Sequence, residues 1–232
     1  MKLTNDNKNI SSPVSTFNYN ASLKKPDRTF LNKAIKVERY LNRPLASFVV
    51  RLVYHTPVTP NGLTFFSFFL GILGAFFLSR GNYLYFILGG IGIQLSSIID
   101  CADGMLARSK NMCSEFGSHL DIFLDRIMDF AMIIGISVGV YRALDNKNFL
   151  ILGFLAAGLY LLQVNLYYLT TSYLQRNEKG QTGEARALML LMVMVLGIAN
   201  RLDIGIYLLL TETVAVNFVR IIYFISLGKR KV

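Results

Sequence analysis

Four aspartates near the middle of the chain have the spacing that most clearly indicates chemistry. Asp100 and Asp103 are followed by Asp121 and Asp125, and all four lie among apolar segments long enough to cross a bilayer. A carboxylate at membrane depth is energetically costly, so an acidic cluster there usually has a function. We interpret these residues as ligands for divalent metal ions.

Helical spacing gathers the four carboxylates onto two facing stripes, because residues three or four positions apart share one face of a helix. The first stripe comprises Asp100, Asp103 and Ala107, and the second comprises Gly117, Asp121 and Asp125. The residues between them, 109–116, predict a tight turn, so the two helices pack antiparallel and the carboxylates share one cup. Unpaired carboxylates would repel one another. Two Mg²⁺ or Mn²⁺ ions would satisfy them, because hard cations prefer oxygen ligands.

Three neighbours of the aspartates are suited to a diphosphate. Gly104 and Gly117 have no side chain and let a ligand or a backbone approach closely. Arg108 offers a planar fork of donors that matches a phosphate group. Metal, arginine and glycine together predict a pocket for a substrate that contains a diphosphate.

The composition is that of an integral membrane protein. Hydrophobic residues make up 53% of the chain and charged residues 16%, below the roughly 25% charged residues of soluble domains. Apolar stretches of about 17 to 20 residues, the length that spans a hydrocarbon core, recur from residue 62 onward. We predict an all-α polytopic membrane protein with six transmembrane helices, over residues 62–79, 82–105, 117–141, 148–173, 186–200 and 203–227.

Composition also divides the chain into four regions. Residues 1–28 are polar and predict a flexible tail. Residues 29–55 mix basic and bulky apolar side chains, which is typical of an amphipathic helix in the membrane interface, bent at Pro44. An ordinary helix packed on the domain is the alternative. Residues 56–228 form the six-helix membrane domain, and residues 229–232 form a basic cytoplasmic end.

The formal charge of +10 is distributed unevenly. Cytoplasmic loops of membrane proteins carry an excess of Lys and Arg. Placing both termini in the cytoplasm assigns 18 basic residues to that side and four to the other. We therefore expect the termini and the aspartate cup to lie on the cytoplasmic side of the cell membrane. The basic charge is interpreted as topology and attraction to anionic lipid, not as nucleic-acid binding.

The two stripes together resemble the signature of the CDP-alcohol phosphotransferase family. The matching residues are Asp100, Asp103, Gly104, Ala107 and Arg108, then, after a gap of eight residues, Gly117, Asp121 and Asp125. The six-helix layout and the preceding amphipathic helix also agree with this family. The likeness covers about residues 30–228.

The resemblance implies an enzyme that works as a homodimer and transfers a substituted phosphate group from a CDP-alcohol to a second alcohol, releasing CMP. It implies metal binding by Asp100, Asp103, Asp121 and Asp125. It also implies that Asp125 is the base that deprotonates the acceptor hydroxyl. The CDP-binding residues that it implies are Asn61, Thr64, Asp103, Gly104, Ala107, Arg108 and Gly117.

The donor that we expect is CDP-diacylglycerol, because a donor with a lipid tail suits a site at the boundary between bilayer and cytoplasm. Arg126, Asp129 and the segment 56–64 are similar to the branches of the family that use inositol phosphate. In that branch, arginines at places similar to Arg186 and Arg220 bind the acceptor phosphate. Inositol phosphate is thus the predicted acceptor, with glycerol phosphate, serine and inositol as alternatives. Both arginines have an alternative role, snorkelling to lipid headgroups.

Asp129 extends the acidic stripe by one turn beyond Asp125. We expect it to pair with Arg126, three residues earlier. The alternative is a contact with the outer shell of the second metal ion.

Two other classes of protein, a transporter and a catalytically idle partner subunit, fit the sequence less well than a phosphotransferase. A transporter would use the aspartates as a relay, but the chain has no internal repeat of the kind common in transporters. A catalytically idle partner subunit would have no reason to keep four unpaired carboxylates. We therefore favour the enzyme.

Overall fold

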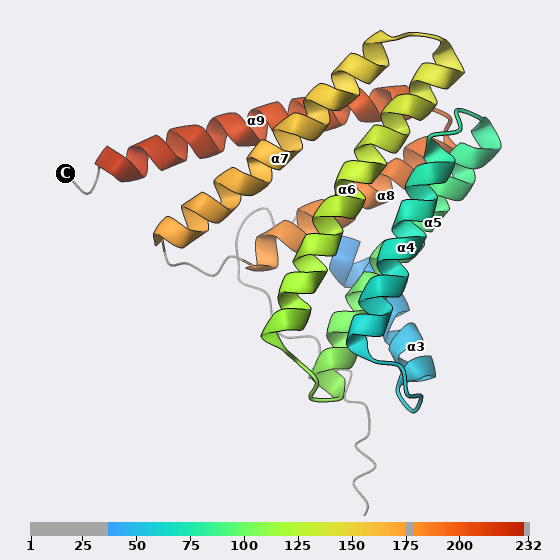
Figure 1. Cartoon of the computed structure of the whole chain (residues 1–232), viewed down its shortest axis with the longest axis vertical. Helices are drawn as coiled ribbons and strands as arrows, with labels where there is room; N and C mark the ends of the chain where they lie inside the picture. The colour runs from blue at the N-terminus through green and yellow to red at the C-terminus, as the bar shows by residue number, and fades with distance from the viewer. Residues whose placement is uncertain (1–36, 175–178, 230–232) are drawn as a thin grey trace, which may run out of the picture.

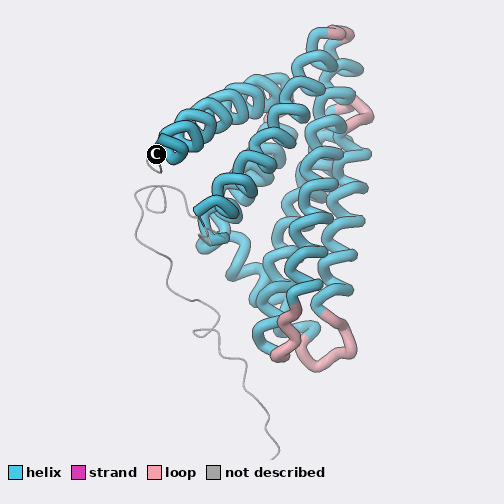
Figure 2. The backbone as a smooth tube through the Cα atoms, turned by 60° about the vertical axis from the view of Figure 1, so that its left-hand side comes forward, coloured by secondary structure: helices cyan, strands magenta, loops and turns pink. Residues whose placement is uncertain are grey.

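The structure is a computed structural model that describes residues 37–174 and 179–229. Within these ranges every regular element is a helix, and short loops join the helices (Figures 1 and 2). The elements are η1 (Glu38–Asn42), α3 (Arg43–Val53), α4 (Pro60–Leu78), α5 (Tyr83–Ser109), α6 (Glu115–Leu144), α7 (Asn148–Leu174), α8 (Lys179–Ile198) and α9 (Leu202–Lys229). The predicted all-α class is confirmed. The predicted tail over residues 1–28, the start of the predicted amphipathic helix and residues 230–232 lie outside the described residues.

Five helices are long and apolar enough to cross a membrane. They are α4, α5, α6, the Asn148–Thr170 part of α7 and the Leu202–Ser226 part of α9. The part of α8 whose side chains are described, Arg186–Ile198, is apolar. At 1.5 Å per residue that part is about 20 Å long, shorter than a hydrocarbon core of about 30 Å. Multiple spans are therefore shown, and α8 as a sixth span stays a prediction.

The long helices form a column with an inclined group beside it. Figure 1 shows α4, α5 and α6 running side by side, with α7, α8 and α9 tilted against them. The α5 helix contacts both α4 and α8, while α6 contacts α4 and α7. A core of buried side chains joins both groups, and its largest members include Leu78, Ile93, Met132, Ile136, Leu190 and Ile206. The helices that carry the four aspartates are thus held on both flanks.

Two side-chain caps fix the helix starts nearest the aspartates. The hydroxyl of Thr59 accepts a hydrogen bond from the backbone N–H of Gly62 at 3.2 Å and begins α4. The hydroxyl of Ser114 accepts one from the N–H of Gly117 at 3.0 Å and begins α6. Each cap satisfies a backbone donor that has no partner inside its helix. The register of both helices at this end is therefore set locally.

The segment before α4 is anchored to α5 by a buried amide. Asn42 ends the π-helical turn η1, just before Pro44, whose missing N–H removes one backbone hydrogen bond. The Asn42 side chain donates to the Ser97 hydroxyl at 2.8 Å and accepts from the Gln94 amide at 2.9 Å. Ser97 lies one turn before Asp100 on α5. The described part of the predicted amphipathic helix is therefore fastened directly beside the aspartates.

Close packing of α6 on α4 depends on a glycine. A Cβ atom on Gly139 would collide with the carbonyl oxygen of Leu78 at the end of α4. Because that oxygen belongs to the backbone, the two helices would have to move apart. We expect Gly139→Ala to destabilise the protein by roughly 1–3 kcal/mol, the usual cost of overpacking. Thermal unfolding followed by circular dichroism in detergent measures this loss.

Gly158 on α7 supplies the matched control. A Cβ atom there would meet nothing within 4 Å. Gly158→Ala is expected to leave the unfolding midpoint unchanged or to raise it slightly, since alanine restricts the unfolded chain. Equal midpoints for the two variants would contradict the role given to Gly139.

Candidate functional site

Helices α5 and α6 bring three of the four aspartates into one group. Asp100 and Asp103 lie on α5, and Asp121 lies on α6. One carboxylate oxygen from each lies within 4.8 Å of those of the other two. Asp103 is buried, with 6% of its surface exposed. Asp121 has a buried Oδ1 without any hydrogen-bond partner.

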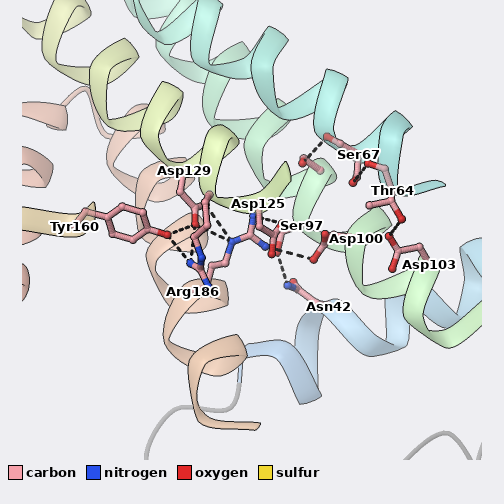
Figure 3. Close-up of polar contacts among 12 residues, drawn as sticks. Asn42, Thr64, Ser67, Ser97, Asp100, Asp103, Asp125, Asp129, Tyr160 and Arg186 are labelled. Atoms are coloured by element: carbon pink, nitrogen blue, oxygen red, sulfur yellow. Dashed lines mark hydrogen bonds and ion pairs between the residues drawn. The ribbon is translucent and has the colours of Figure 1, made fainter. Parts of the chain in front are cut away.

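The beginning of α4 lies against this group. The Thr64 hydroxyl donates to Oδ2 of Asp103 at 2.6 Å, and Thr64 is itself buried. Asn61 lies one turn earlier and faces α6, because its Oδ1 would be 3.0 Å from a Cβ atom placed on Gly117. A side chain at position 117 would therefore fill the space between the two helices. Figure 3 shows Thr64 and Asp103 pointing toward each other from α4 and α5.

The remaining residues of the predicted CDP set follow on α5. The guanidinium of Arg108 lies back over Gly104, with Nη1 3.4 Å from the position of a Cβ atom there. Ala107 lies one turn after Gly104 and is partly exposed. Together with Thr64 and Asn61, these residues surround the aspartates at the end of the bundle where α5 ends and α6 begins.

Asp125, the fourth motif aspartate, pairs with an arginine of α8. Its Oδ1 lies 2.8 Å from Nη2 of Arg186 on α8. Arg186 also pairs with Asp100 at 3.4 Å and with Asp129 at 3.0 Å, and only 12% of its side chain is exposed. The arginine is therefore inserted among the carboxylates (Figure 3).

Arg220 is placed elsewhere. Its Nη1 donates to the carbonyl oxygen of Gln163 at 3.0 Å, and its guanidinium stacks 5.1 Å from the ring centre of Tyr167. These contacts are with α7. The side chains of Arg176 and Lys179, two further cations near the loop before α8, lie outside the described residues.

Two residues of the cluster, Asp129 and Tyr160, are harder to identify from the sequence. Asp129 is completely buried and pairs with Arg126 at 3.5 Å, as expected, but also with Arg186. The hydroxyl of Tyr160 on α7 donates to Oδ2 of Asp129 and accepts from Arg126 Nη1 at 2.6 Å. Asp129 is detectable as an acid one turn beyond Asp125. Tyr160 has no such signal, because nothing in its local sequence separates it from the other tyrosines.

Charge in this cluster is strongly unbalanced. Among the residues that the structure describes, five carboxylates, including that of Asp129, lie together, and two guanidinium groups, those of Arg126 and Arg186, form ion pairs with them. Among the described ion pairs, Asp103 and Asp121 have no cation. Buried carboxylates without a counter-charge are costly. The arrangement therefore favours binding of further positive charge at the group formed with Asp100.

A small cavity adjoins the aspartates on the side of α4. Its volume is about 10 Å³, near the minimum for one water molecule. The lining residues are Thr64, Ser67, Phe68, Ser96, Asp100, Leu124, Asp125 and Met128. A cavity of this size does not hold a substrate.

Comparison with known proteins agrees with this geometry. The family model described as CDP-alcohol phosphatidyltransferase matches residues 57–222. A bifunctional IPC transferase and DIPP synthase of Thermococcus kodakarensis is 37% identical over 113 residues, which cover 46% of this chain and 25% of that protein. The archaetidylinositol phosphate synthase of Pyrococcus horikoshii is 26% identical over 151 residues, covering 65% of this chain and 75% of that one. The chain thus spans about a quarter of the length of the bifunctional relative.

A solved structure has the same fold. The phosphatidylinositol phosphate synthase of Mycobacterium tuberculosis, crystallised with CDP-DAG bound, superposes with a TM-score of 0.62 at 17% identity. The match covers 77% of this chain and 92% of the other. The family match extends over most of the chain and includes every helix from α4 to α8 together with most of α9. The chain therefore belongs to the CDP-alcohol phosphatidyltransferase family.

Proposed function

We propose that this chain transfers a substituted phosphate group from CDP-diacylglycerol to the hydroxyl of a second alcohol and releases CMP. The observation that carries the proposal is the group of carboxylates from Asp100, Asp103 and Asp121, within 4.8 Å of one another on two helices. Family membership supports the reaction class. The solved relative with CDP-DAG bound supports the choice of donor.

The residues present fit a divalent cation. Three carboxylates offer oxygen ligands at one place, and Oδ1 of Asp121 is buried without a donor. Oxygen donors of this kind suit Mg²⁺ and Mn²⁺. When bound, such an ion would polarise the diphosphate and neutralise charge on the departing CMP. Of the two ions predicted from the sequence, the second would require Asp125, whose carboxylate contacts Arg186 in this structure.

The proposed chemistry assigns distinct tasks to the residues around the aspartates. Asp125 accepts the proton from the acceptor hydroxyl, whose oxygen then attacks the phosphorus that carries the diacylglycerol. The bond between that phosphorus and the oxygen retained by CMP breaks. Asp103 and the CDP-binding residues hold the nucleotide; besides Asp103 they are Asn61, Thr64, Gly104, Ala107, Arg108 and Gly117.

We propose inositol phosphate as the acceptor. Two of the relatives named above are inositol phosphate lipid synthases by name. Arg186 is the cation next to Asp125, the position where an acceptor phosphate would come close to the base. Its donors are directed at carboxylates, so a phosphate would have to share them. Arg220 would reach the acceptor only by leaving its contacts on α7.

The proposal includes a membrane arrangement. The chain would be a homodimer with six spans, α8 being the sixth, and with its termini and aspartates on the cytoplasmic side. Segment α3 would lie in the interface, since Leu45, Phe48 and Leu52 are exposed there together with Arg51.

A single assay tests the reaction. Purified protein in mixed micelles is given CDP-diacylglycerol and, in turn, inositol phosphate, inositol, glycerol phosphate and serine, and CMP release is measured. We expect release with Mg²⁺ or Mn²⁺, fastest with inositol phosphate, and none with EDTA. CMP release only from a soluble CDP-alcohol would overturn the choice of donor. No release from any CDP-alcohol would overturn the reaction itself.

A further inference from the structure

The guanidinium of Arg186 contacts three carboxylates, each through a different nitrogen. Its Nε contacts both oxygens of Asp129, at 3.0 and 3.1 Å. Nη2 lies 2.8 Å from Asp125, and Nη1 lies 3.4 Å from Asp100. A guanidinium is planar and presents its donors in a rigid fork. Fixing the Nε edge on Asp129 therefore determines the direction of the two terminal nitrogens.

The carboxylate that holds the Nε edge is itself fixed. Asp129 is completely buried, and Tyr160 is 7% exposed. The Tyr160 hydroxyl donates to Asp129 (Figure 3). Arg126 donates to Tyr160 at 2.6 Å. These contacts join α6 to α7 and, through Arg186, to α8. A buried polar network with most of its members paired holds its side chains in one arrangement.

We propose that Asp129 and Tyr160 are positioning residues that hold Arg186 so that its terminal nitrogens orient the carboxylates of Asp125 and Asp100. Neither residue touches the substrate. Their effect reaches the reaction through Arg186, which presents one oxygen of Asp125 in a set direction. This inference rests on the proposed function, because it requires Asp125 to be the base.

The proposal makes a specific kinetic prediction for Tyr160→Phe. This change removes one hydroxyl and keeps the ring, so Asp129 loses a donor while the packing of α7 on α6 is retained. We expect kcat for CMP release to fall about tenfold to a hundredfold. This is the usual range for residues that orient a metal-ligating side chain through a hydrogen bond. KM for CDP-diacylglycerol and for the acceptor should change by less than about threefold.

A double-mutant cycle separates positioning from general stability. Arg186→Lys replaces the fork by a single ammonium, which cannot contact Asp129 and Asp125 in the same way. In that background Tyr160→Phe should have little further effect on kcat, because residues that act through one contact are not additive. Tyr83→Phe is the matched control: its hydroxyl donates to the Ile198 carbonyl at 3.1 Å, at the opposite end of α5, and kcat should not change.

The possible results separate the positioning role of Tyr160 from the proposed function on which it rests. A wild-type chain that releases no CMP from any donor overturns the proposed function. Normal wild-type turnover with an unchanged kcat for Tyr160→Phe overturns the positioning role alone. A raised acceptor KM at constant kcat also overturns it, and would assign Arg186 to the acceptor phosphate. Equal losses in the wild-type and Arg186→Lys backgrounds would show that Tyr160 acts independently of Arg186.

Discussion

Asp125→Asn is expected to lower kcat for CMP release by about 10²- to 10⁴-fold, the range contributed by a general base. Asparagine keeps the size of the side chain and still accepts a hydrogen bond from Arg186, which lies 2.8 Å from Asp125. It cannot accept the proton of the acceptor hydroxyl. Binding of the CDP donor should persist, because the proposed nucleotide residues lie around Asp103 and Gly117. Steady-state CMP release and equilibrium binding of labelled CDP-diacylglycerol measure the two quantities separately.

Asp203→Asn provides the matched control for this change. Asp203, in the first turn of α9, pairs with Arg201 at 3.2 Å, outside the aspartate cluster, and its side chain is 27% exposed. Its replacement should leave both kcat and donor affinity unchanged. Full turnover by Asp125→Asn would remove Asp125 from the role of base. Loss of donor binding with that variant would instead give Asp125 a role in holding the nucleotide.

The sequence was sufficient to predict that α5 and α6 bring three of their aspartates together. Only residues 110–114 separate these helices, so they run in opposite directions, but the expected packing of one on the other is wrong, because each packs mainly on α4. The three- and four-residue spacing then places Asp100, Asp103 and Asp121 on facing sides. In the structure, a cap by Ser114 begins α6. Short connections and helical periodicity together account for the part of the site that could be predicted.

The contacts of Arg186 could not be predicted in the same way. Arg186 is 57 residues from Asp129 in the chain, and α7 lies between them in sequence. Its position depends on how α8 packs on α5, which no local pattern specifies. The same holds for Tyr160, which reaches Asp129 only because α7 packs against α6. Sequence reasoning gave Arg186 two possible partners, phosphate or headgroups, whereas the structure places it among carboxylates.

The two halves of the cluster consequently differ in their charge balance. On the α7–α8 side, Asp129 and Asp125 are compensated by Arg126 and Arg186. On the α4 side, Asp103 accepts a hydrogen bond from the neutral hydroxyl of Thr64. The carboxylates of Asp125 and Asp129 are thus paired with protein cations, whereas Asp103 has no cation among the described ion pairs. This asymmetry indicates where an added cation would have its largest effect on stability.

Asp121→Asn is therefore expected to lower activity without lowering metal-free stability. Without divalent cation, removing one of three neighbouring carboxylates relieves like-charge repulsion, so the unfolding midpoint in EDTA should rise or stay equal. With Mg²⁺ or Mn²⁺ at about 100 times Kd, the wild type should gain about 2.7 kcal/mol by linkage. The variant should lose most of that gain, together with CMP release. Thermal unfolding across a metal titration measures both effects.

Glu212→Gln makes the same carboxylate-to-amide change away from the cluster. Glu212 lies on α9 and accepts a hydrogen bond from the Gln163 amide at 3.2 Å. This variant should keep the full metal-dependent rise in unfolding midpoint, which would show that the response belongs to Asp121 and not to acidic side chains in general. A midpoint for Asp121→Asn that falls in EDTA yet rises normally with metal would make Asp121 a structural residue. In that case the buried Oδ1 of Asp121 would need another partner, and the proposed metal group would lose its α6 ligand.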